Sequence, residues 1–126
     1  MKKNLFAAIC ILPALYCTIS CTQLGHHNIN ITMSESGHYY KMVAYYNKSR
    51  SLEVDKYMDK HFGKASNMSF VNTRIDGDIA MNDGTNFYIN KKAGYLKITF
   101  DKNKNSLHAY KEVKAFGNDL KLAVQQ

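Results

Sequence analysis

Five separate runs of residues alternate between apolar and polar side chains, and this pattern constrains the fold more than any other sequence feature. Successive side chains of a strand point to opposite faces, so strict alternation predicts a strand with one buried face. The runs are 27–34, 38–47, 71–81, 86–90 and 95–100. Gly77 interrupts the third run, and we expect a β-bulge there. Glycine-containing turns separate the first run from the second and the third from the fourth, and residues 91–94, Lys-Lys-Ala-Gly, form the turn that we expect between the fourth and the fifth.

Two segments follow the helical period instead, in which apolar residues recur every three or four positions. In the first, residues 51–62, we expect Ser51 as the N-cap and Gly63 as the C′ residue. The second begins at Ser106. Gly117 lies within it, and a glycine there either breaks the helix or lets it approach the sheet closely; we expect one helix. The apolar stripes consist of Val54, Tyr57, Met58, His61 and Phe62, and of Leu107, Tyr110, Val113, Phe116, Leu120 and Val124.

The predicted order of elements is therefore ββαβββα. Each strand has one apolar face and each helix one apolar stripe, so both helices can cover the same side of one sheet. We expect an α+β fold, a two-layer sandwich in which a five-stranded, mainly antiparallel sheet carries two helices on one face. With 126 residues the chain has room for one domain, which we assign to residues 28–126.

The first twenty residues have the pattern of a secretory signal peptide. Lys2 and Lys3 precede an apolar run, residues 5–19, that contains no charged residue. That run is shorter than the roughly 20 residues of a membrane-spanning helix, and Pro13 lies within it. We therefore assign residues 1–20 to a signal peptide. The alternative is a buried N-terminal helix.

All three cysteines, Cys10, Cys17 and Cys21, lie at or before position 21. The stretch Thr18-Ile19-Ser20-Cys21 resembles the lipobox of bacterial lipoproteins. This resemblance implies cleavage before Cys21 and a lipid on its sulfur, with residues 21–27 as the lipidated end and a short tether. It also implies an outer-membrane location facing the periplasm, because no Asp follows Cys21 as an inner-membrane retention signal. The alternative is cleavage by a general signal peptidase, which releases a soluble periplasmic or secreted protein.

The chain is basic, with 17 Lys and Arg against 10 Asp and Glu and a formal net charge of +7. Removal of Lys2 and Lys3 with the leader would leave 15 against 10, a net charge of +5. A basic sheet face with aromatic side chains can bind single-stranded nucleic acid. The predicted strand order differs from that of an RRM, however, no RNP-type motif is present, and export removes the protein from cytoplasmic nucleic acid. We expect no nucleic-acid partner.

The polar positions of the strands collect on the sheet face that the helices do not cover. Tyrosine offers a large amphipathic contact area at low entropic cost, so interfaces use it. The alternative is that these residues only stabilise an exposed sheet through cross-strand pairs. The residues that we predict to form a binding face are Tyr39, Lys41, Tyr45, Arg74, Tyr88, Tyr95 and Lys97, within an outward set that also includes Asn28, Asn30, Thr32, Asn72, Asp76, Asp78, Asn86, Asn90 and Thr99.

Signals for catalysis, metals and cofactors are weak. His26 and His27 lie in the presumed tether without a third ligand at a suitable spacing. The segment around Asp76 and Asp78 lacks the ligand spacing of a calcium loop, and no nucleophile elbow or phosphate-binding loop is present. We expect a non-catalytic module that binds a protein or an envelope polymer such as a polysaccharide, without a cofactor. The alternatives are an accessory envelope protein without a discrete ligand and a small secreted hydrolase.

Overall fold

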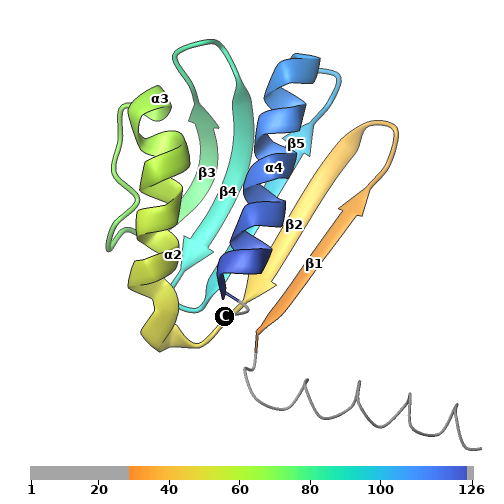
Figure 1. The fold of residues 1–126 in the computed structure, drawn as a ribbon. Coiled ribbons are helices and arrows are strands. Elements are labelled where there is room, and N and C mark those ends of the chain that lie inside the picture. The colour runs from red at the N-terminus through yellow and green to blue at the C-terminus, as the bar shows by residue number, and fades with distance from the viewer. Residues whose placement is uncertain (1–28, 125–126) are drawn as a thin grey trace, which may run out of the picture.

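The computed structural model describes residues 29–124, and its elements follow the order ββαβββα (Figure 1). A 3₁₀ turn, Lys48–Arg50, precedes the first helix, and a π-helical turn, Asp59–Gly63, joins α2 to α3. The fold class is therefore confirmed as α+β. The strands are β1 Asn30–Glu35, β2 Tyr39–Tyr45, β3 Ile75–Ala80, β4 Asn86–Lys92 and β5 Tyr95–Asp101, and the helices are α2 Ser51–Met58, α3 Lys64–Ser66 and α4 Leu107–Val124.

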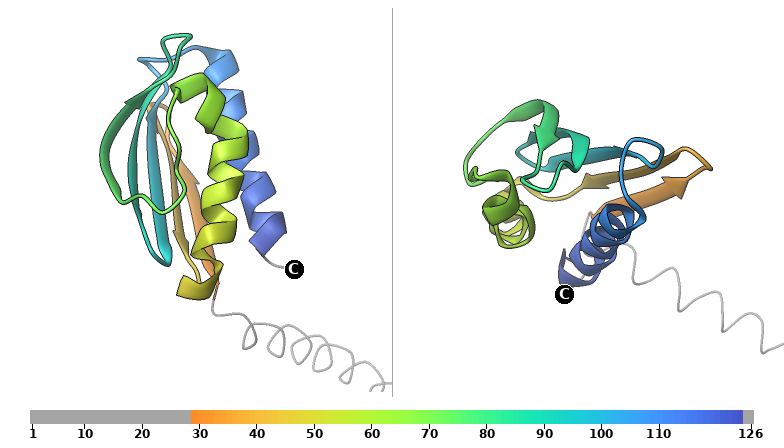
Figure 2. Two further views of the ribbon diagram at one scale, coloured as in Figure 1. Left: turned by 90° about the vertical axis from the view of Figure 1, so that its left-hand side faces the viewer. Right: turned by 90° about the horizontal axis from the view of Figure 1, so that it is seen from above.

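The five strands form one sheet in the order β1-β2-β5-β4-β3, and every neighbouring pair is antiparallel. The first helix, which runs from α2 through the π-helical turn to α3, and the last helix, α4, lie on the same side of this sheet. The opposite side carries no helix of the described chain (Figure 2). The chain leaves β2, crosses through α2 to the far edge at β3 and returns strand by strand to β5 beside β2. The two-layer arrangement predicted from the alternation is thus present.

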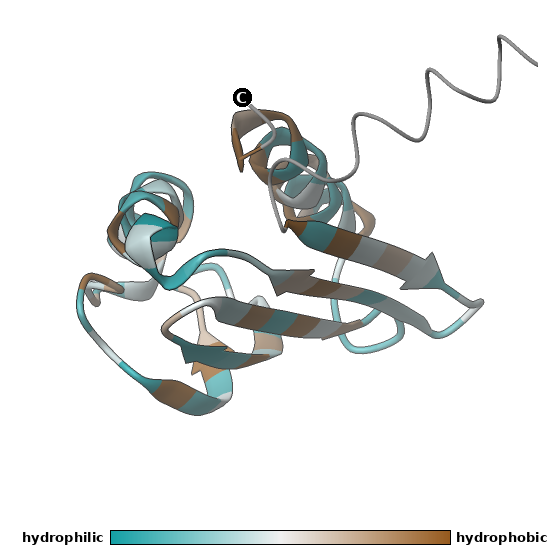
Figure 3. Ribbon diagram, turned by 90° about the horizontal axis from the view of Figure 1, so that it is seen from below, coloured by the Kyte–Doolittle hydropathy of each residue, from teal (hydrophilic) through white to brown (hydrophobic). Residues whose placement is uncertain are grey.

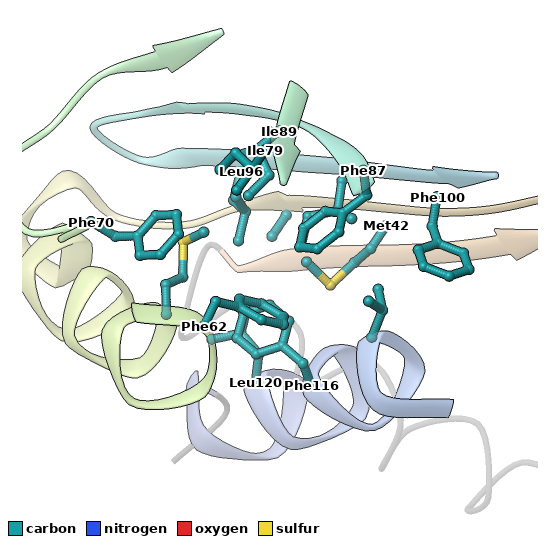
Figure 4. Close-up of a cluster of buried hydrophobic side chains, with 14 of the residues drawn as sticks. Met42, Phe62, Phe70, Ile79, Phe87, Ile89, Leu96, Phe100, Phe116 and Leu120 are labelled. Atoms are coloured by element: carbon teal, nitrogen blue, oxygen red, sulfur yellow. The ribbon is translucent and has the colours of Figure 1, made fainter. Parts of the chain in front are cut away.

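The core fills the space between the sheet and the two helices (Figure 4). Alternate residues of each strand point into it, so apolar and polar residues alternate along the ribbons in Figure 3. On the central strands the inward residues are almost inaccessible to solvent, and the helices meet them with a group of aromatic and aliphatic side chains. The core includes Tyr40, Met42, Ala44, Leu96, Ile98 and Phe100 from the sheet, and Met58, Phe62, Phe116 and Leu120 from the helices.

The boundaries of the first helix differ from those predicted. Ser51 is the first helical residue rather than the N-cap, and its hydroxyl accepts a hydrogen bond from the Gly94 amide at 2.9 Å. Gly63 has ordinary helical dihedral angles, so the helix continues through the π-helical turn to Ser66. The helix ends at Asn67, which adopts the left-handed conformation with φ of 57°. Asparagine tolerates this conformation better than most other residues do.

The third strand is shorter than the alternation indicated. It begins at Ile75 rather than at residue 71, and its register with β4 is continuous through Gly77, so the expected bulge is absent. The Asp59 carboxylate accepts a hydrogen bond from the Phe70 amide, 2.5 Å away, and the Asp55 carboxylate accepts one from Asn72, 3.0 Å away. These bonds hold the preceding residues in a loop along the first helix instead of in the sheet.

Gly117 lies inside one continuous helix, α4, as expected. A Cβ atom at this position would stand 2.4 Å from the Tyr40 hydroxyl and 3.2 Å from the Met42 sulfur. The glycine therefore lets α4 approach β2 closely. At the start of α4, the Ser106 hydroxyl accepts a hydrogen bond from the Ala109 amide at 3.1 Å, which is the geometry of an N-cap.

Candidate binding face

The uncovered face of the sheet brings most of the predicted binding residues into cross-strand rows. Directly opposed residues of an antiparallel pair lie on the same face, and the register therefore defines each row. One row runs from Tyr45 on β2 through Tyr95 on β5 to Lys92 on β4. Lys97 lies in the next row between Val43 and Asn90, and Lys41 lies in the third row, which continues through Thr99 to Tyr88.

Tyr45 and Tyr95 form an aromatic pair at the end of this face. Their ring centroids are 5.1 Å apart at an interplanar angle of 60°, and the Lys92 ammonium lies 5.5 Å from the Tyr95 centroid. Tyr45 is 54% exposed, and Tyr39, at the other end of β2, is 48% exposed. Partial burial of Tyr95 raises the pKa of its phenol, and the neighbouring Tyr45 adds to this effect. The pair thus offers a large aromatic area to solvent.

Arg74 extends the same row, although it is not part of a strand. The β3–β4 register, continued one residue past Ile75, would place Arg74 opposite Lys92. Both residues line a hollow of about 300 Å³ at this end of the sheet, which Ser51 and Asp55 of α2 also line, so the hollow reaches the helix layer. Arg74 therefore joins the face at its rim. The predicted outward position of Asn72 in the sheet is wrong, because that residue lies in the loop with φ of 55°.

We call Tyr45, Tyr95, Lys92 and Arg74 the aromatic–basic row. None of the ion pairs among residues 29–124 involves Lys92, Arg74, Lys41 or Lys97. The cations of this face thus have no acidic partner within the described part of the chain. The sequence did not predict Lys92 on this face, because residues 91–94 have the pattern of a turn. It continues the outward positions of Tyr88 and Asn90, so the alternation itself could have placed it here.

The Tyr88 side chain makes a hydrogen bond within the sheet and does not belong to the aromatic pair. Its hydroxyl donates a hydrogen bond to the carboxylate of Asp76 on β3, and this bond is the main cause that raises the pKa of Tyr88. Asp76 and Asp78 make the β3 side of the face acidic, whereas Lys41, Lys97 and Lys92 make its centre and one end basic. The acidic pair Asp76 and Asp78 therefore lies on β3, and the lysines lie at the centre of the face and at the end with the tyrosine pair.

A second hollow lies at the opposite end of the face, beside the β1–β2 turn. It has a volume of about 380 Å³ and is open to solvent, and Tyr39, Lys41 and Glu35 line it together with Ser34, Ser36 and Thr99. The Glu35 carboxylate accepts hydrogen bonds from Lys114 at 2.7 Å, Lys102 at 2.9 Å and Tyr110 at 2.5 Å. These bonds lower the pKa of Glu35 to about 2, with the Lys114 bond as the largest cause. Sequence separation hid this cluster, which joins β1 to α4.

The histidines do not assemble a metal site in the described residues. His61 and His108 line a hollow of about 270 Å³ between the first helix and α4, together with Asp83 and Glu112. No group of three or more His, Cys, Asp or Glu side chains among residues 29–124 is arranged to hold a metal ion. His61, which the helical period places on the apolar stripe of the first helix, is exposed at the surface. Its ring packs beside those of Tyr57 and Phe116, with centroid distances of 4.7 and 5.4 Å.

The described residues do not include the predicted signal peptide, 1–20, or the predicted tether, 21–27, with the predicted lipid on Cys21. They also leave out Cys10, Cys17, His26, His27 and Asn28. Within residues 29–124, no helix is both long enough and apolar enough to cross a bilayer. No protein-family model matches the chain, and no curated protein or solved structure matches it either. The function is therefore argued from the residues of this chain.

Proposed function

We propose that this protein is an exported, lipid-anchored envelope protein that binds a partner protein through the uncovered sheet face. The observation that carries the proposal is the aromatic–basic row, in which the exposed Tyr45 and the half-buried Tyr95 form an aromatic pair beside Lys92. Arg74 lies beyond Lys92 at the rim, and neither cation forms an ion pair within the described chain. Tyrosine and arginine are the residue types enriched at the energetic centres of protein interfaces. The N-terminal pattern supports export and acylation of Cys21.

The charges favour a partner of a stated kind. Lys92 and Lys97 lie beside the tyrosine pair, and Arg74 lies at the rim beyond Lys92. A complementary surface would therefore present carboxylates near an apolar recess that accepts the two rings. The face is broad, with one hollow at the end beside the β1–β2 turn, and the hollow at Arg74 lies at its rim and reaches α2. A flat face of this shape suits the surface of a folded protein better than an extended polymer chain, which tracks a continuous groove. An envelope polysaccharide is the competing ligand that the experiment must distinguish.

The test is an in-cell crosslinking experiment with face variants. The double variant Tyr45→Ser/Tyr95→Ser removes both rings, and Leu122→Ser is the matched control because Leu122 is 64% exposed on α4, in the helix layer. We expect a defined protein partner to crosslink to the wild type and to Leu122→Ser. The crosslinking yield of the double variant should be at least tenfold lower, as for the loss of an interface hot spot. Protection from hydrogen exchange in the isolated complex should centre on β2 and β5.

A separate pair of substitutions tests the electrostatic part of the proposal. Lys92→Gln and Arg74→Gln should weaken binding of that partner and reduce its salt dependence, because exposed charge pairs are screened by salt. Retention of binding in the tyrosine double variant, or recovery of polysaccharide instead of protein, would overturn the proposed partner. If neither the wild type nor any variant crosslinks to a partner, the result would favour an accessory envelope protein without a discrete ligand.

The membrane anchor is tested independently by mass spectrometry of the mature N-terminus. We expect the first residue to be Cys21 with a diacylglyceryl mass on its sulfur and an acyl chain on its amine. Two or more chains anchor a protein stably, whereas one holds it only marginally. The variant Cys21→Ser should carry no acyl mass. A mature form with an unmodified Cys21, or with Met1 retained, would contradict the lipid anchor.

A further inference from the structure

The sheet has two edges, and they are built differently. β1 and β3 each pair with one neighbour only, so each leaves one row of backbone N–H and C=O groups without a strand partner among the described residues. Free edges are templates for pairing with another strand, and proteins usually protect them with charges, proline or bulges. Figure 1 shows the two edge strands at opposite sides of the sheet.

β3 carries such protection and β1 does not. Asp76 and Asp78 flank Gly77 on β3, so a two-fold pairing of this strand with a second copy would oppose like charges. β1 reads Asn-Ile-Thr-Met-Ser-Glu and contains no proline, no lysine and no charge before its last residue. Its register with β2 is continuous, so it contains no bulge. The unprotected edge is therefore β1.

The sequence of β1 is also self-complementary about Thr32. In an antiparallel two-fold pairing with Thr32 opposite Thr32 of a second copy, Ile31 would face Met33, and Asn30 would face Ser34. Directly opposed residues lie on the same side of a sheet, so apolar side chains would meet on the helix side and polar ones on the uncovered side. No two charges oppose each other among these five positions.

β1 is held firmly in position by contacts to the helix layer and to the β5–α4 loop. Its last residue, Glu35, is bonded to Lys114 and Tyr110 of α4 and to Lys102 of that loop. Met33 lies against Gly117, since a Cβ at that glycine would stand 3.5 Å from the Met33 sulfur. An ordered strand loses little further conformational entropy on pairing, which favours association.

We propose that β1 is a homodimerisation strand that pairs antiparallel with β1 of a second copy of this chain. The two sheets would then form one continuous sheet about a two-fold axis through Thr32. Both helix layers would lie on one side and both uncovered faces on the other. The pairing does not depend on the proposed partner protein, because it uses the edge of the sheet rather than its face; the crosslinking test alone rests on the proposed export.

Cysteine crosslinking in cells that export the full chain tests the register. In Thr32→Cys the exposed residue Thr32 is replaced by cysteine. A disulfide requires Cα atoms within about 7 Å, and the proposed register places the two copies of residue 32 opposite each other, so a disulfide between them should form in the oxidising envelope. Asn30→Cys alone should not form a disulfide between the copies, since the new thiol of each copy would face Ser34 of the other copy. Co-expression of Asn30→Cys with Ser34→Cys should restore a mixed disulfide. Peptide mass spectrometry distinguishes these links from any link through Cys10, Cys17 or Cys21.

The dissociation constant tests the proposal without a covalent link. Sedimentation of the purified mature protein in a non-ionic detergent should show a dimer for wild type and for Asn86→Lys, which adds the same charge on β4. Thr32→Lys should weaken dimerisation by about tenfold or more, because the two lysines would oppose each other. A monomeric wild type, crosslinking of Asn30→Cys as strong as that of Thr32→Cys, or equal dimerisation of the two lysine variants would overturn the proposal. If β1 instead paired with an earlier segment of the same chain, the wild type would be monomeric.

Discussion

The ammonium of Lys91 lies 2.8 Å from a carboxylate oxygen of Asp55, and the two side chains are only 3% and 6% exposed. Lys91 Nζ also donates a hydrogen bond to the Thr73 carbonyl at 2.5 Å, and the other Asp55 oxygen accepts one from the Asn72 amide at 3.0 Å. One buried ion pair therefore ties β4, α2 and the loop before β3 together. Its partners satisfy both charges, which is the condition under which a buried pair is tolerated.

Lys91→Met should destabilise the protein by about 3 kcal/mol, because the Asp55 carboxylate would stay buried without its cation. The matched control is Lys92→Met, which removes the neighbouring but exposed lysine and should change the free energy of unfolding by less than about 0.5 kcal/mol. Urea denaturation measures both values. The double variant Asp55→Leu/Lys91→Met should recover part of the loss, since it removes both buried charges. Equal stability of the two single variants would contradict the role of this pair.

Gly117→Ala should destabilise the protein by about 1–3 kcal/mol, although alanine is the better helix former by about 1 kcal/mol. The reason is the Tyr40 hydroxyl, which would lie 2.4 Å from the new Cβ. Tyr40→Phe removes that oxygen, so the double variant should regain much of the loss in a double-mutant cycle. Asn118→Ala, at an exposed position of the same helix, serves as the control for helix propensity. Thermal unfolding monitored by circular dichroism gives the comparison.

Tyr40→Phe alone should leave stability unchanged or raise it. The Tyr40 hydroxyl is buried and has no hydrogen-bond partner among the described residues, so its removal abolishes a desolvation cost without breaking a bond. The same burial raises the pKa of Tyr40 to about 12. Guanidinium denaturation of the variant and the wild type tests this expectation. A loss of more than about 1 kcal/mol would show that the hydroxyl has a partner in solution.

Stability should fall in acid in a way that depends on Glu35. Its pKa is lowered from 4.5 to about 2 in the folded protein by the bonds from Lys114, Tyr110 and Lys102. A carboxyl with a depressed folded-state pKa stabilises the protein above its unfolded-state pKa, and this contribution is lost as the pH falls towards the folded-state value. Glu35→Gln should thus be less stable than wild type above pH 4.5, and the difference should shrink between pH 4.5 and pH 2.

Urea titrations at a series of pH values measure this difference, and Glu112→Gln is the control at an exposed position of α4. The control should follow the wild-type curve. A constant difference between Glu35→Gln and wild type across the whole range would contradict the assignment.

Gly94→Ala should destabilise the β4–β5 hairpin, whereas Gly37→Ala in the β1–β2 turn should not. Gly94 has φ of 77°, and a Cβ there would stand 2.9 Å from the Tyr46 carbonyl oxygen. A left-handed alanine costs about 1–2 kcal/mol before any clash is counted. Gly37 has no heavy atom within 4 Å of the corresponding position. Chemical denaturation of the two variants should therefore separate them clearly, and similar values would contradict this account of the turn.

Much of the fold could be predicted because its determinants are local. Alternation assigned Tyr40 and Met42 to one face of β2 and Tyr39 and Lys41 to the other, and the structure agrees. The errors occurred where long-range hydrogen bonds override a local pattern. Asp55 and Asp59 hold residues 70–72 against the first helix, so the alternation of 71–81 becomes a strand only from Ile75. Lys91 looked like a turn residue because its buried carboxylate partner lies 36 residues earlier.

The candidate site divides in the same way. Tyr45, Tyr95, Lys41 and Lys97 were predicted to share a face, because each occupies a polar position of an alternating run. Their arrangement in rows was not predictable, since the rows depend on the strand order β1-β2-β5-β4-β3 and on the register of each pair. That order also brings Lys92 to the tyrosine pair, and the β3–β4 register would place Arg74 next to Lys92.

The sequence by itself determined the number and kind of elements and the face to which each strand residue belongs, because these follow from periods of two and of about three and a half residues along the chain. Only the tertiary structure decided which strands are neighbours, which strands are edges and which distant charges meet. These depend on how α2 and α4 pack on the sheet, and close packing of the core accepts one arrangement in which the apolar faces are buried and the buried charges are paired.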